Sequence, residues 1–592
     1  MTYGCHKRHI PGLDFLKTLA ILGVTFFHLM PDVLPGGYLG VSFFFVLTGY
    51  LLAYQADGSQ HFGLISYYLK RGRRIYPSLF IVLLTTLGVF SLVAPETMGG
   101  VRQEVLSIVL GYNNWWQIKE SADYFSRMAA ASPFTHLWFL GVELQYYLVW
   151  PLIFAFFVAL KELMGRRGAT VFFALLSFAT AALMPFLYTP AADVTRLYYG
   201  TDTRLYAFLF GAVMGFMENS REALQPNSLG KNVFLVLTAF CSLIPLGVAF
   251  LWLDGANPLV YQGGMLVITL VFCATLGAVA HLPAAQVLDK PLFSWLGKHS
   301  YGLFLWQYPV IFLFEHWGIT GGVALATEIG IILALTLWSD ALSAMLLRPR
   351  SFMGAGRAVF VKVAAVFVVT VFASFIMGYG CYGLAASSPD KDEAQTKLAA
   401  QLNREAAKLQ NKEATSNAVP AKKDNAPDLR GITFIGDSVM LGAASEINRL
   451  FPEAKVNAEV SRYVNGGADE LEKLVAEGSV GDTVVVHLGT NGPIAGSERY
   501  EVHSRRIFEM LGAKRKIFWL NTHAPHLKWQ NTNNEFLQAA VKTHPNLTVI
   551  DWHSEAAKHP AWLTADGIHP TEEGIKAYAA LIRDVIVKSG AE

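Results

Sequence analysis

Long uninterrupted runs of apolar residues dominate the first 384 positions of the chain. A helix needs roughly 20 apolar residues to cross about 30 Å of hydrocarbon. Runs of about this length predict eleven membrane spans, near 12–30, 36–55, 76–94, 137–160, 169–188, 204–217, 232–253, 259–281, 300–316, 322–346 and 359–384. The sixth run is short, and the loop 95–135 carries a further apolar piece, Val105 to Trp116, as a candidate for dipping into the membrane.

From residue 431 the pattern changes to short apolar strands that alternate with amphipathic helices. The strands are expected at 431–435, 483–488, 516–520 and 547–550, and the helices around 439–450, 467–477, 498–512, 533–543 and 571–587. Strand–helix alternation over such a length predicts a three-layer α/β domain with a parallel sheet. The site of such a domain is expected at the carboxyl ends of its strands.

Between these two regions, residues 385–430 contain no aromatic residue and are rich in Ala, Lys, Asn, Asp and Gln. A stretch of this composition cannot bury a core. We interpret it as a solvated tether, with a polar helix over Asp392 to Glu413 as the alternative. The predicted organisation is therefore a membrane domain at 1–384, a polar linker at 385–430 and a soluble domain at 431–592.

The distribution of charge supports this division. Hydrophobic residues make up 53% of the 592 positions and charged residues 16%, but 41 of the charges fall in residues 1–384 and 51 in the much shorter remainder. The formal net charge of +2 gives no reason to expect a nucleic-acid partner. The four cysteines all lie before residue 385, so the soluble domain is expected to have neither a disulfide framework nor a thiolate metal site.

The loops between the predicted spans differ in their cation content. With the N-terminus in the cytoplasm, the inside segments hold 17 Lys and Arg residues and the outside segments hold 5. The positive-inside rule therefore predicts a cytoplasmic N-terminus, and an odd number of spans then places the C-terminal domain outside. We expect a multi-pass protein of the cell membrane, in contact with the lipid bilayer.

Polar residues gather where the predicted strands end. Ser438 follows the first strand at the start of a helix, which exposes its hydroxyl beside helix N–H groups that can stabilise an oxyanion. Asn491 follows the strand 483–488 and brings a side-chain amide to the same edge. Near the C-terminus, Asp566 and His569 lie three apart in a loop, so that the carboxylate can orient the imidazole while the imidazole takes the serine proton. Each piece alone is common in turns, but their joint occurrence predicts a catalytic site.

These motifs resemble those of the SGNH (GDSL-like) hydrolase family. The resemblance implies that Ser438 is the nucleophile, that Asn491 supplies an oxyanion-hole amide and that Asp566 and His569 complete the triad. The block that usually supplies a glycine N–H to the oxyanion hole matches weakly. Ser461 stands where that glycine is expected, and Gly466 or Gly467 is the alternative donor.

Ionisable side chains inside predicted spans are costly and therefore candidates for function. His28 lies in the first span and Glu143 in the fourth; the structural alternatives are an interhelical hydrogen bond for His28 and an ion pair with Arg204 for Glu143. Arg73 and Arg74 belong to a cationic cluster at the predicted cytoplasmic face. Such a cluster can contact lipid headgroups or bind the phosphates of a cofactor.

The first 384 residues resemble the acyltransferase-3 family of multispanning membrane proteins. The resemblance rests on stretches that begin at Ile10, Phe43, Lys70, His136 and Thr201, and on Leu296 through Trp306. It favours His28 as general base or acyl-transfer residue and assigns acyl transfer or CoA binding to Arg73, Arg74, Glu143 and Arg204. The family commonly has His after the last Trp, whereas this chain has Gln307, which argues against proton transfer at that position.

An acyltransferase-3 domain tethered to an extracytoplasmic SGNH domain resembles the peptidoglycan O-acetyltransferases of Gram-positive bacteria. That resemblance implies transfer of acetyl from cytosolic acetyl-CoA, across the membrane, to the C6 hydroxyl of N-acetylmuramoyl residues through an acetyl-serine. It implies acetyl-CoA as donor, with no tightly bound cofactor, and peptidoglycan as the glycan acceptor.

Three alternatives remain open from the sequence. The acceptor can be another surface polysaccharide, teichoic acid or lipopolysaccharide. The soluble domain can be an acetyl esterase, because water resolves an acetyl-serine as readily as a sugar does. A transporter with a glycan-binding outer domain is the non-enzymatic alternative, against which stands the lack of an internal repeat. No metal site is expected, since the histidines of the soluble domain are scattered without paired helical spacing.

Overall fold

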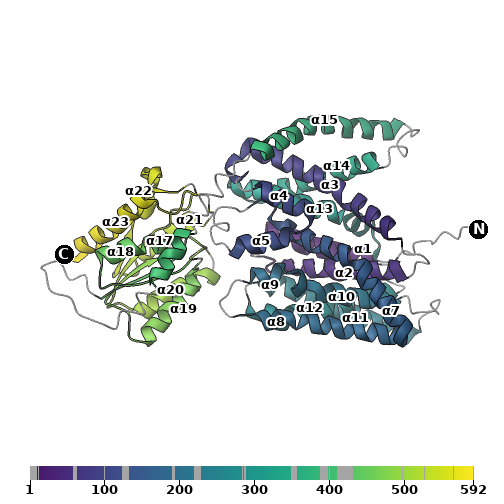
Figure 1. Ribbon diagram of the computed structural model, residues 1–592, viewed down its shortest axis with the longest axis horizontal. Coiled ribbons are helices and arrows are strands. Elements are labelled where there is room, and N and C mark those ends of the chain that lie inside the picture. The colour runs from purple at the N-terminus through teal and green to yellow at the C-terminus, as the bar shows by residue number, and fades with distance from the viewer. Residues whose placement is uncertain are drawn as a thin grey trace, which may run out of the picture. The chain divides into compact units, whose positions relative to one another are not determined.

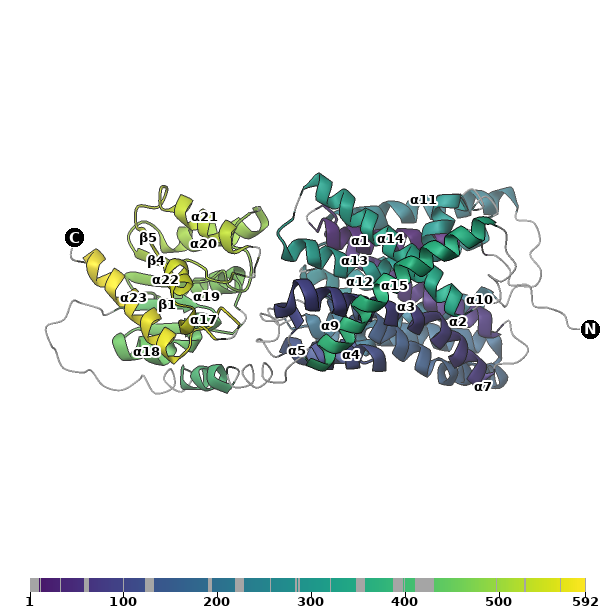
Figure 2. The same cartoon turned by 90° about the horizontal axis from the view of Figure 1, so that it is seen from above.

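The computed structural model describes residues 10, 12–31, 33–57, 63–98, 101–122, 132–189, 194–218, 228–255, 257–282, 285, 288–319, 321–347, 357–386, 398, 400–409, 431–460, 462–496, 498–525, 527, 529–564 and 566–590. The chain divides into a helical unit, Met1–Lys119 with Ser132–Ser387, and an α/β unit that contains Ser388–Glu592. Figures 1 and 2 show packed helices in the first unit and a sheet flanked by helices in the second.

The long apolar runs form helices throughout the helical unit. They are α1 (Leu13–Leu29), α2 (Gly40–Asp57), α3 (Leu64–Val93), α4 (Val101–Leu110), α5 (Asn113–Ala122), α7 (Trp138–Ala181), α8 (Leu183–Leu187), α9 (Thr195–Tyr199), α10 (Thr201–Glu218), α11 (Leu229–Trp252), α12 (Met265–His281), α13 (Pro291–His316), α14 (Gly322–Leu347) and α15 (Arg357–Ala386). A short 3-10 turn, η3 (Thr135–Leu137), leads into α7.

Six helical segments in the described part of the chain are long and apolar enough to cross a membrane. They are Gly37–Asp57, Leu64–Val93, Thr135–Leu187, Leu229–Trp252, Val260–His281 and Gly322–Leu347. The predicted spans near 12–30, 204–217, 300–316 and 359–384 also coincide with helices, namely α1, α10, α13 and α15. The chain therefore has several membrane-compatible helices, while the predicted number of eleven spans stays a prediction.

The segment α7 is bent back on itself at Gly165. Gly165 has a φ of 75°, which is outside the helical region and favours glycine. The rings of Phe156 and Phe172 lie 5.7 Å apart, although 16 residues of straight helix would separate them by about 24 Å. The chain thus reverses between the predicted spans 137–160 and 169–188, as the two separate apolar runs indicated.

Small residues let α2 and α10 pack backbone against backbone. A Cβ at Gly49 of α2 would collide with the Phe208 carbonyl of α10, and a Cβ at Gly211 of α10 would collide with the Val46 carbonyl of α2. Glycines on facing helices are a common way to bring membrane helices close together. Of these two helices, α2 also lines the cleft described below.

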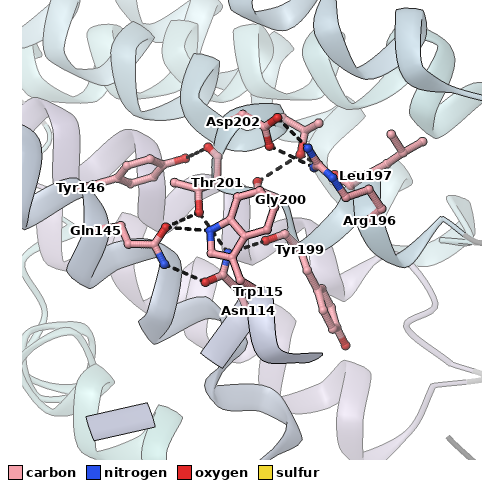
Figure 3. Close-up of polar contacts among 11 residues, drawn as sticks. Asn114, Trp115, Gln145, Tyr146, Arg196, Leu197, Tyr199, Gly200, Thr201 and Asp202 are labelled. Carbon is pink, nitrogen blue, oxygen red and sulfur yellow. Dashed lines mark hydrogen bonds and ion pairs between the residues drawn. The ribbon is translucent and has the colours of Figure 1, made fainter. Parts of the chain in front are cut away.

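A polar network holds α5 against α7 and α10 (Figure 3). The Gln145 amide donates to Asn114 Oδ1 at 2.8 Å, and the Asn114 amide donates to the Thr201 hydroxyl at 3.0 Å. The Thr201 hydroxyl and the Trp115 indole N–H both donate to Gln145 Oε1. The predicted apolar piece Val105 to Trp116 is therefore two short helices, α4 and the start of α5, fixed by side-chain amides.

The α/β unit is built on a five-stranded, wholly parallel sheet of order β2-β1-β3-β4-β5. Its elements are β1 (Ile432–Gly436), α17 (Ser438–Gly442), α18 (Ala444–Leu450), β2 (Lys455–Ala458), α19 (Val464–Ala476), β3 (Thr483–His487), α20 (Glu498–Leu511), β4 (Lys516–Leu520), α21 (Gln530–Ala540), β5 (Leu547–Ile550), α22 (Trp552–Lys558) and α23 (Glu572–Gly590). One hydrophobic core joins the sheet to α18, α22 and α23, and a second joins it to α19, α20 and α21. The predicted three-layer α/β arrangement with a parallel sheet is thus present.

Two elements of this unit were missing from the sequence prediction. The edge strand β2 has only one buried residue, Val456, so its sequence carries no apolar run. The two-turn helix α22 lies between β5 and the loop that carries Asp566. Both are short, and neither has the hydrophobic period that identified the other elements.

Part of the predicted tether packs on the α/β unit. Residues 400–409 are helical, and Leu398 and Leu402 are buried against Leu441 of α17. The backbone N–H of Ser445 donates to the Glu405 carboxylate at 3.0 Å. The expectation of a solvated tether is therefore wrong for these residues, because leucines at helical spacing were hidden in a polar composition. The rest of 385–430 lies almost wholly outside the described residues.

We predict that Leu402→Ala destabilises a fragment comprising residues 388–592. Leu402 is fully buried in a small cluster, so the loss is expected near the lower end for leucine truncation, about 2 kcal/mol. The exposed neighbour Gln401 supplies the control, and Gln401→Ala should change the free energy of unfolding by less than about 0.5 kcal/mol. Urea denaturation measures both; equal values for the two variants would mean that this helix does not dock.

Candidate active site

Ser438 lies where the sequence places it, at the carboxyl end of β1 and the first position of α17. Asp437 caps this helix, because its side chain accepts a hydrogen bond from the Val439 N–H at 3.0 Å. The Asp437 N–H in turn donates to the His487 carbonyl of the neighbouring strand β3. The serine is thus fixed between two strands and at a helix N-terminus, where backbone N–H groups favour developing negative charge.

The structure brings Ser438, His569 and Asp566 into one hydrogen-bonded chain. The His569 Nε2 atom lies 2.9 Å from Ser438 Oγ, and His569 Nδ1 lies 2.6 Å from Asp566 Oδ2. Ser438 is fully buried and His569 is 1% exposed. This is the geometry in which an imidazole takes the proton of a serine while a carboxylate holds its tautomer.

Asp566 is held in the ionised form by its surroundings. Its Oδ1 atom accepts hydrogen bonds from the Thr564 hydroxyl and from the N–H groups of Ile568 and His569, at 2.8–2.9 Å. Burial alone would raise the pKa of this carboxyl. The hydrogen bonds and the imidazole outweigh burial and lower the pKa of Asp566 to about 2.

Asn491 lies after β3 and is positioned by Arg462. Its amide donates to the Arg462 carbonyl at 3.1 Å, which leaves the second N–H of the amide for a substrate oxygen. The Arg462 guanidinium, 8% exposed, donates to the carbonyls of Gly436 and Asn457 at the ends of β1 and β2. Arg462 thereby ties the Asn491 loop to the strand that carries the serine, a role that the sequence did not reveal because no motif marks it.

The backbone donor of the oxyanion hole stays a prediction. Ser461 lies outside the described residues. Of the two alternatives, the Gly467 N–H already donates to the Tyr463 carbonyl at 3.0 Å. A Cβ at Gly467 would also collide with Leu488, so packing explains that glycine. Gly466, in the first turn of α19, is the alternative that remains.

A second buried polar group lies beside the serine. His487, at the end of β3, has its Nδ1 atom 2.7 Å from the Tyr578 hydroxyl. Burial lowers the pKa of His487, although the Asp437 carboxylate opposes that shift. His487 is one of the histidines that the sequence showed as scattered, and the structure shows it to be buried next to the triad strand.

In the helical unit, four charged side chains line one cleft: Lys17, Arg71, Arg74 and Glu143. Glu143 is satisfied locally, since the hydroxyls of Thr48 and Tyr147 donate to its Oε1 at 3.0 and 2.7 Å. The Arg71 guanidinium lies 4.9 Å from the centre of the Tyr147 ring. The predicted residues Arg74 and Glu143 thus meet in this cleft.

Two other predicted residues of the helical unit lie elsewhere. Arg73 is exposed and is not among the residues that line the cleft. Arg204, 1% exposed, donates to the Tyr198 carbonyl at 2.8 Å and to the Ser42 hydroxyl at 3.1 Å, and also contacts Met265. The ion pair that was considered between Glu143 and Arg204 is not formed. Glu143 and Arg204 each have other hydrogen-bond partners nearby.

His28 lies near the C-terminal end of α1, and Lys17 lies near its start. His28 is partly exposed, while its Nδ1 atom is buried and the Gln307 side chain lies beside its ring. Its ring packs against Phe27 and Tyr308. The structure therefore separates His28 from the cationic cleft and places it among aromatic rings.

A family model described as an acyltransferase domain matches residues 10–379. "Putative peptidoglycan O-acetyltransferase YrhL" of Bacillus subtilis (strain 168) is 29% identical over 98% of this chain and 98% of its own length. "O-acetyltransferase OatA" of Staphylococcus aureus (strain MRSA252) is 26% identical over 98% and 96%. The solved C-terminal catalytic domain of Streptococcus pneumoniae peptidoglycan O-acetyltransferase A is 25% identical, covering 27% of this chain and 91% of that one, with a TM-score of 0.24.

The ionised Asp566 predicts a specific loss of stability in acid. Because its folded pKa of about 2 lies below the ordinary value of about 3.9, its contribution is present above pH 4 and is lost as the pH falls toward 2. Urea denaturation of a 388–592 fragment should show wild type more stable than Asp566→Asn at pH 7. That difference should shrink by about 2 kcal/mol between about pH 5 and about pH 2. A difference that stays constant would contradict the low pKa.

Proposed function

This chain belongs to the acyltransferase domain family, and we propose that it moves acetyl from cytosolic acetyl-CoA across the membrane to the C6 hydroxyl of peptidoglycan N-acetylmuramoyl residues. The observation that carries the proposal is the Ser438–His569–Asp566 chain of hydrogen bonds in the same polypeptide as the acyltransferase domain. The names of the near-full-length relatives, a peptidoglycan O-acetyltransferase and an O-acetyltransferase, support the reaction and its acceptor.

The cleft of the helical unit is the proposed binding site for the donor. Lys17, Arg71 and Arg74 provide three cations at its wall, which suits the phosphates of CoA. Phe44, Leu47 and Leu51 of α2 give the same cleft an apolar side, which suits the uncharged pantetheine arm. Glu143, held by Thr48 and Tyr147, fixes α7 to α2 at this point. Arg73 then contacts solvent or lipid headgroups, and Arg204 holds α10 in place.

The proposed outer reaction follows from the triad geometry. Ser438 attacks the carbonyl of an acetyl ester that the helical unit supplies, His569 takes the serine proton and gives it to the departing oxygen of that ester, and Asp566 stabilises the imidazolium. The tetrahedral oxyanion accepts hydrogen bonds from the Ser438 N–H, from the Asn491 amide and from one further N–H. A sugar hydroxyl, deprotonated by His569, then resolves the acetyl-serine, and the acetyl group leaves as an ester of the sugar.

The proposed topology has the N-terminus in the cytoplasm and the α/β unit outside. The excess of cations in alternate loops supports it. Asp57, at the end of α2, pairs with both Lys161 and Arg166 beside the Gly165 turn of α7. These two chain reversals therefore lie at one face of the helical unit, as an alternating path through a membrane requires.

Hydrolysis and transfer to another surface polysaccharide use the same triad. A covalently attached acyltransferase domain favours transfer, since an esterase needs no acyl supply. The comparison to make is between release of acetate into water and acetyl ester formed on a muramoyl glycan. Faster release of acetate than transfer, with acceptor present, would favour the esterase.

We predict that Ser438→Ala abolishes O-acetylation. Removing a triad nucleophile leaves only binding and oxyanion stabilisation, so the loss should be at least about 10³-fold. Ser589→Ala, at the far end of α23, is the matched control and should retain wild-type acetylation. Mass spectrometry of muropeptides from complemented deletion cells measures both. Full acetylation by Ser438→Ala would remove the α/β unit from the chemistry.

A second variant separates the two halves of the reaction. His28→Ala in the full chain should abolish acetylation in cells, because acyl delivery fails. The same substitution lies outside the 388–592 fragment, which should still cleave an artificial acetyl ester at the wild-type rate. Persisting acetylation by His28→Ala in cells would refute acyl delivery through the helical unit.

A further inference from the structure

The inner end of the donor cleft is closed by two aromatic rings. Phe139 of α7 and Phe304 of α13 both line the cleft, and their ring centres lie 5.1 Å apart in an edge-to-face arrangement. Phe304 is also 5.1 Å from the ring of His136. One phenyl ring therefore lies between the cleft and His136, which begins one of the stretches that resemble the acyltransferase-3 family but has no role in the proposed function so far.

His136 is buried with only backbone carbonyls as partners. It is 4% exposed, and its ring nitrogens have no side-chain partner within the described part of the chain, while the carbonyls of Phe304 and Leu305 lie beside the ring. A neutral imidazole has one donor and one acceptor nitrogen, so these carbonyls leave the acceptor nitrogen buried and unpaired, which costs about 1–3 kcal/mol. A histidine at this position is therefore better explained by chemistry than by stability.

His136 does not stand alone. The ring centre of Tyr308 lies 5.2 Å from that of His136 and 5.2 Å from that of His28. His28 Nδ1 and both side-chain amide atoms of Gln307 are also buried, and the Gln307 amide lies beside the His28 ring. Five buried polar atoms from η3, α1 and α13 are thus gathered near one tyrosine ring, where apolar side chains alone would pack at a lower cost.

The local sequence of α13 helps to form this compartment. Pro309 has no N–H, so the carbonyl of Leu305 lacks its donor within the helix. The backbone carbonyls of Phe304 and Leu305 lie beside the His136 ring. They present an acceptor to one face of the compartment, which favours a neutral imidazole with its proton on that side and a free nitrogen on the other.

We propose that His28, His136, Gln307 and Tyr308 form a closed acyl-transfer compartment, that Phe304 is its gate toward the donor cleft, and that His136 is a second catalytic imidazole. The inference rests on the proposed function and extends it. The thioester end of the donor displaces the Phe304 ring and reaches His136. The partly exposed His28, which also packs against Tyr308, meets the hydroxyl of the acetyl carrier.

The proposed step conserves protons. The oxygen of a carrier hydroxyl, whose ester then supplies Ser438, bonds to the acetyl carbon while the carbon–sulfur bond breaks. The hydroxyl proton passes to His28, from His28 to His136 and from His136 to the departing sulfur. Both imidazoles begin and end neutral, and the products are an acetyl ester and free CoA thiol.

The test uses the purified full chain in detergent and measures CoA thiol released from acetyl-CoA. His136→Asn and His136→Phe should each reduce release by about 10²-fold or more, since acid–base groups typically contribute that much. The thermal midpoint of His136→Phe should stay close to that of wild type, because phenylalanine keeps the aromatic packing and removes a buried unpaired nitrogen. His316→Asn, at an exposed position on α13, is the control and should release thiol at the wild-type rate.

The outcomes distinguish this inference from the proposed function. No thiol release by wild type would overturn acetyl-CoA as donor, and the compartment with it. A wild-type rate in the stably folded His136→Phe would overturn the second imidazole alone, because a structural aromatic role is retained by phenylalanine.

The role of Phe304 as a gate is tested by the size of the acyl group that the protein accepts. Phe304→Ala should raise the rate with butanoyl-CoA relative to acetyl-CoA by several-fold, since it widens the passage to the imidazoles. Leu292→Ala, at an exposed position of the same helix and outside the cleft, should leave this ratio unchanged. An unaltered ratio in Phe304→Ala would contradict the gate.

Discussion

The hydrogen bond between Ser438 and His569 joins groups that are 131 residues apart, and the α/β unit is organised around it. Parallel pairing of β1 with β2 and β3 brings the serine and Asn491 to the same edge of the sheet. The two hydrophobic cores on either face hold that edge rigid, and the buried site keeps water from competing for the proton. Arg462 adds a polar tie between the ends of β1 and β2.

In the helical unit, burial of a polar group is costly unless the group has a hydrogen-bond partner, so a group without one is a candidate for function. Glu143 and Arg204 illustrate the first case, because hydroxyls and carbonyls of neighbouring helices satisfy them. His28, His136 and Gln307 illustrate the second. These side chains lie near Phe304, which lines the cleft that we propose for the phosphorylated donor. In our proposal a substrate supplies the contacts that the protein leaves unmade.

The sequence predicted the features that depend on local patterns of residues. Four of the five strands are apolar runs, and Ser438, Asn491, Asp566 and His569 follow from motifs at strand ends. The edge strand β2 was missed because only Val456 is buried. Leu402 was hidden by the polar residues around it, and Arg462 acts through contacts that no motif records. The stretch that begins at His136 carried the family resemblance, but it did not indicate a role for that histidine. The ion pair considered between Glu143 and Arg204 is not formed. Opposite charges in two spans do not show which neighbouring helix each side chain faces.

The most direct test of the account is to find the acetyl group on its carrier. The full chain, incubated with acetyl-CoA and quenched in acid, would be digested and its peptides analysed by mass spectrometry. We expect one acetyl group on the peptide that contains Ser438, and its loss when a muramoyl glycan is added before quenching. A chain that acetylates the glycan while Ser438 stays unmodified, even in His569→Ala, would contradict the acetyl-serine on which the account rests.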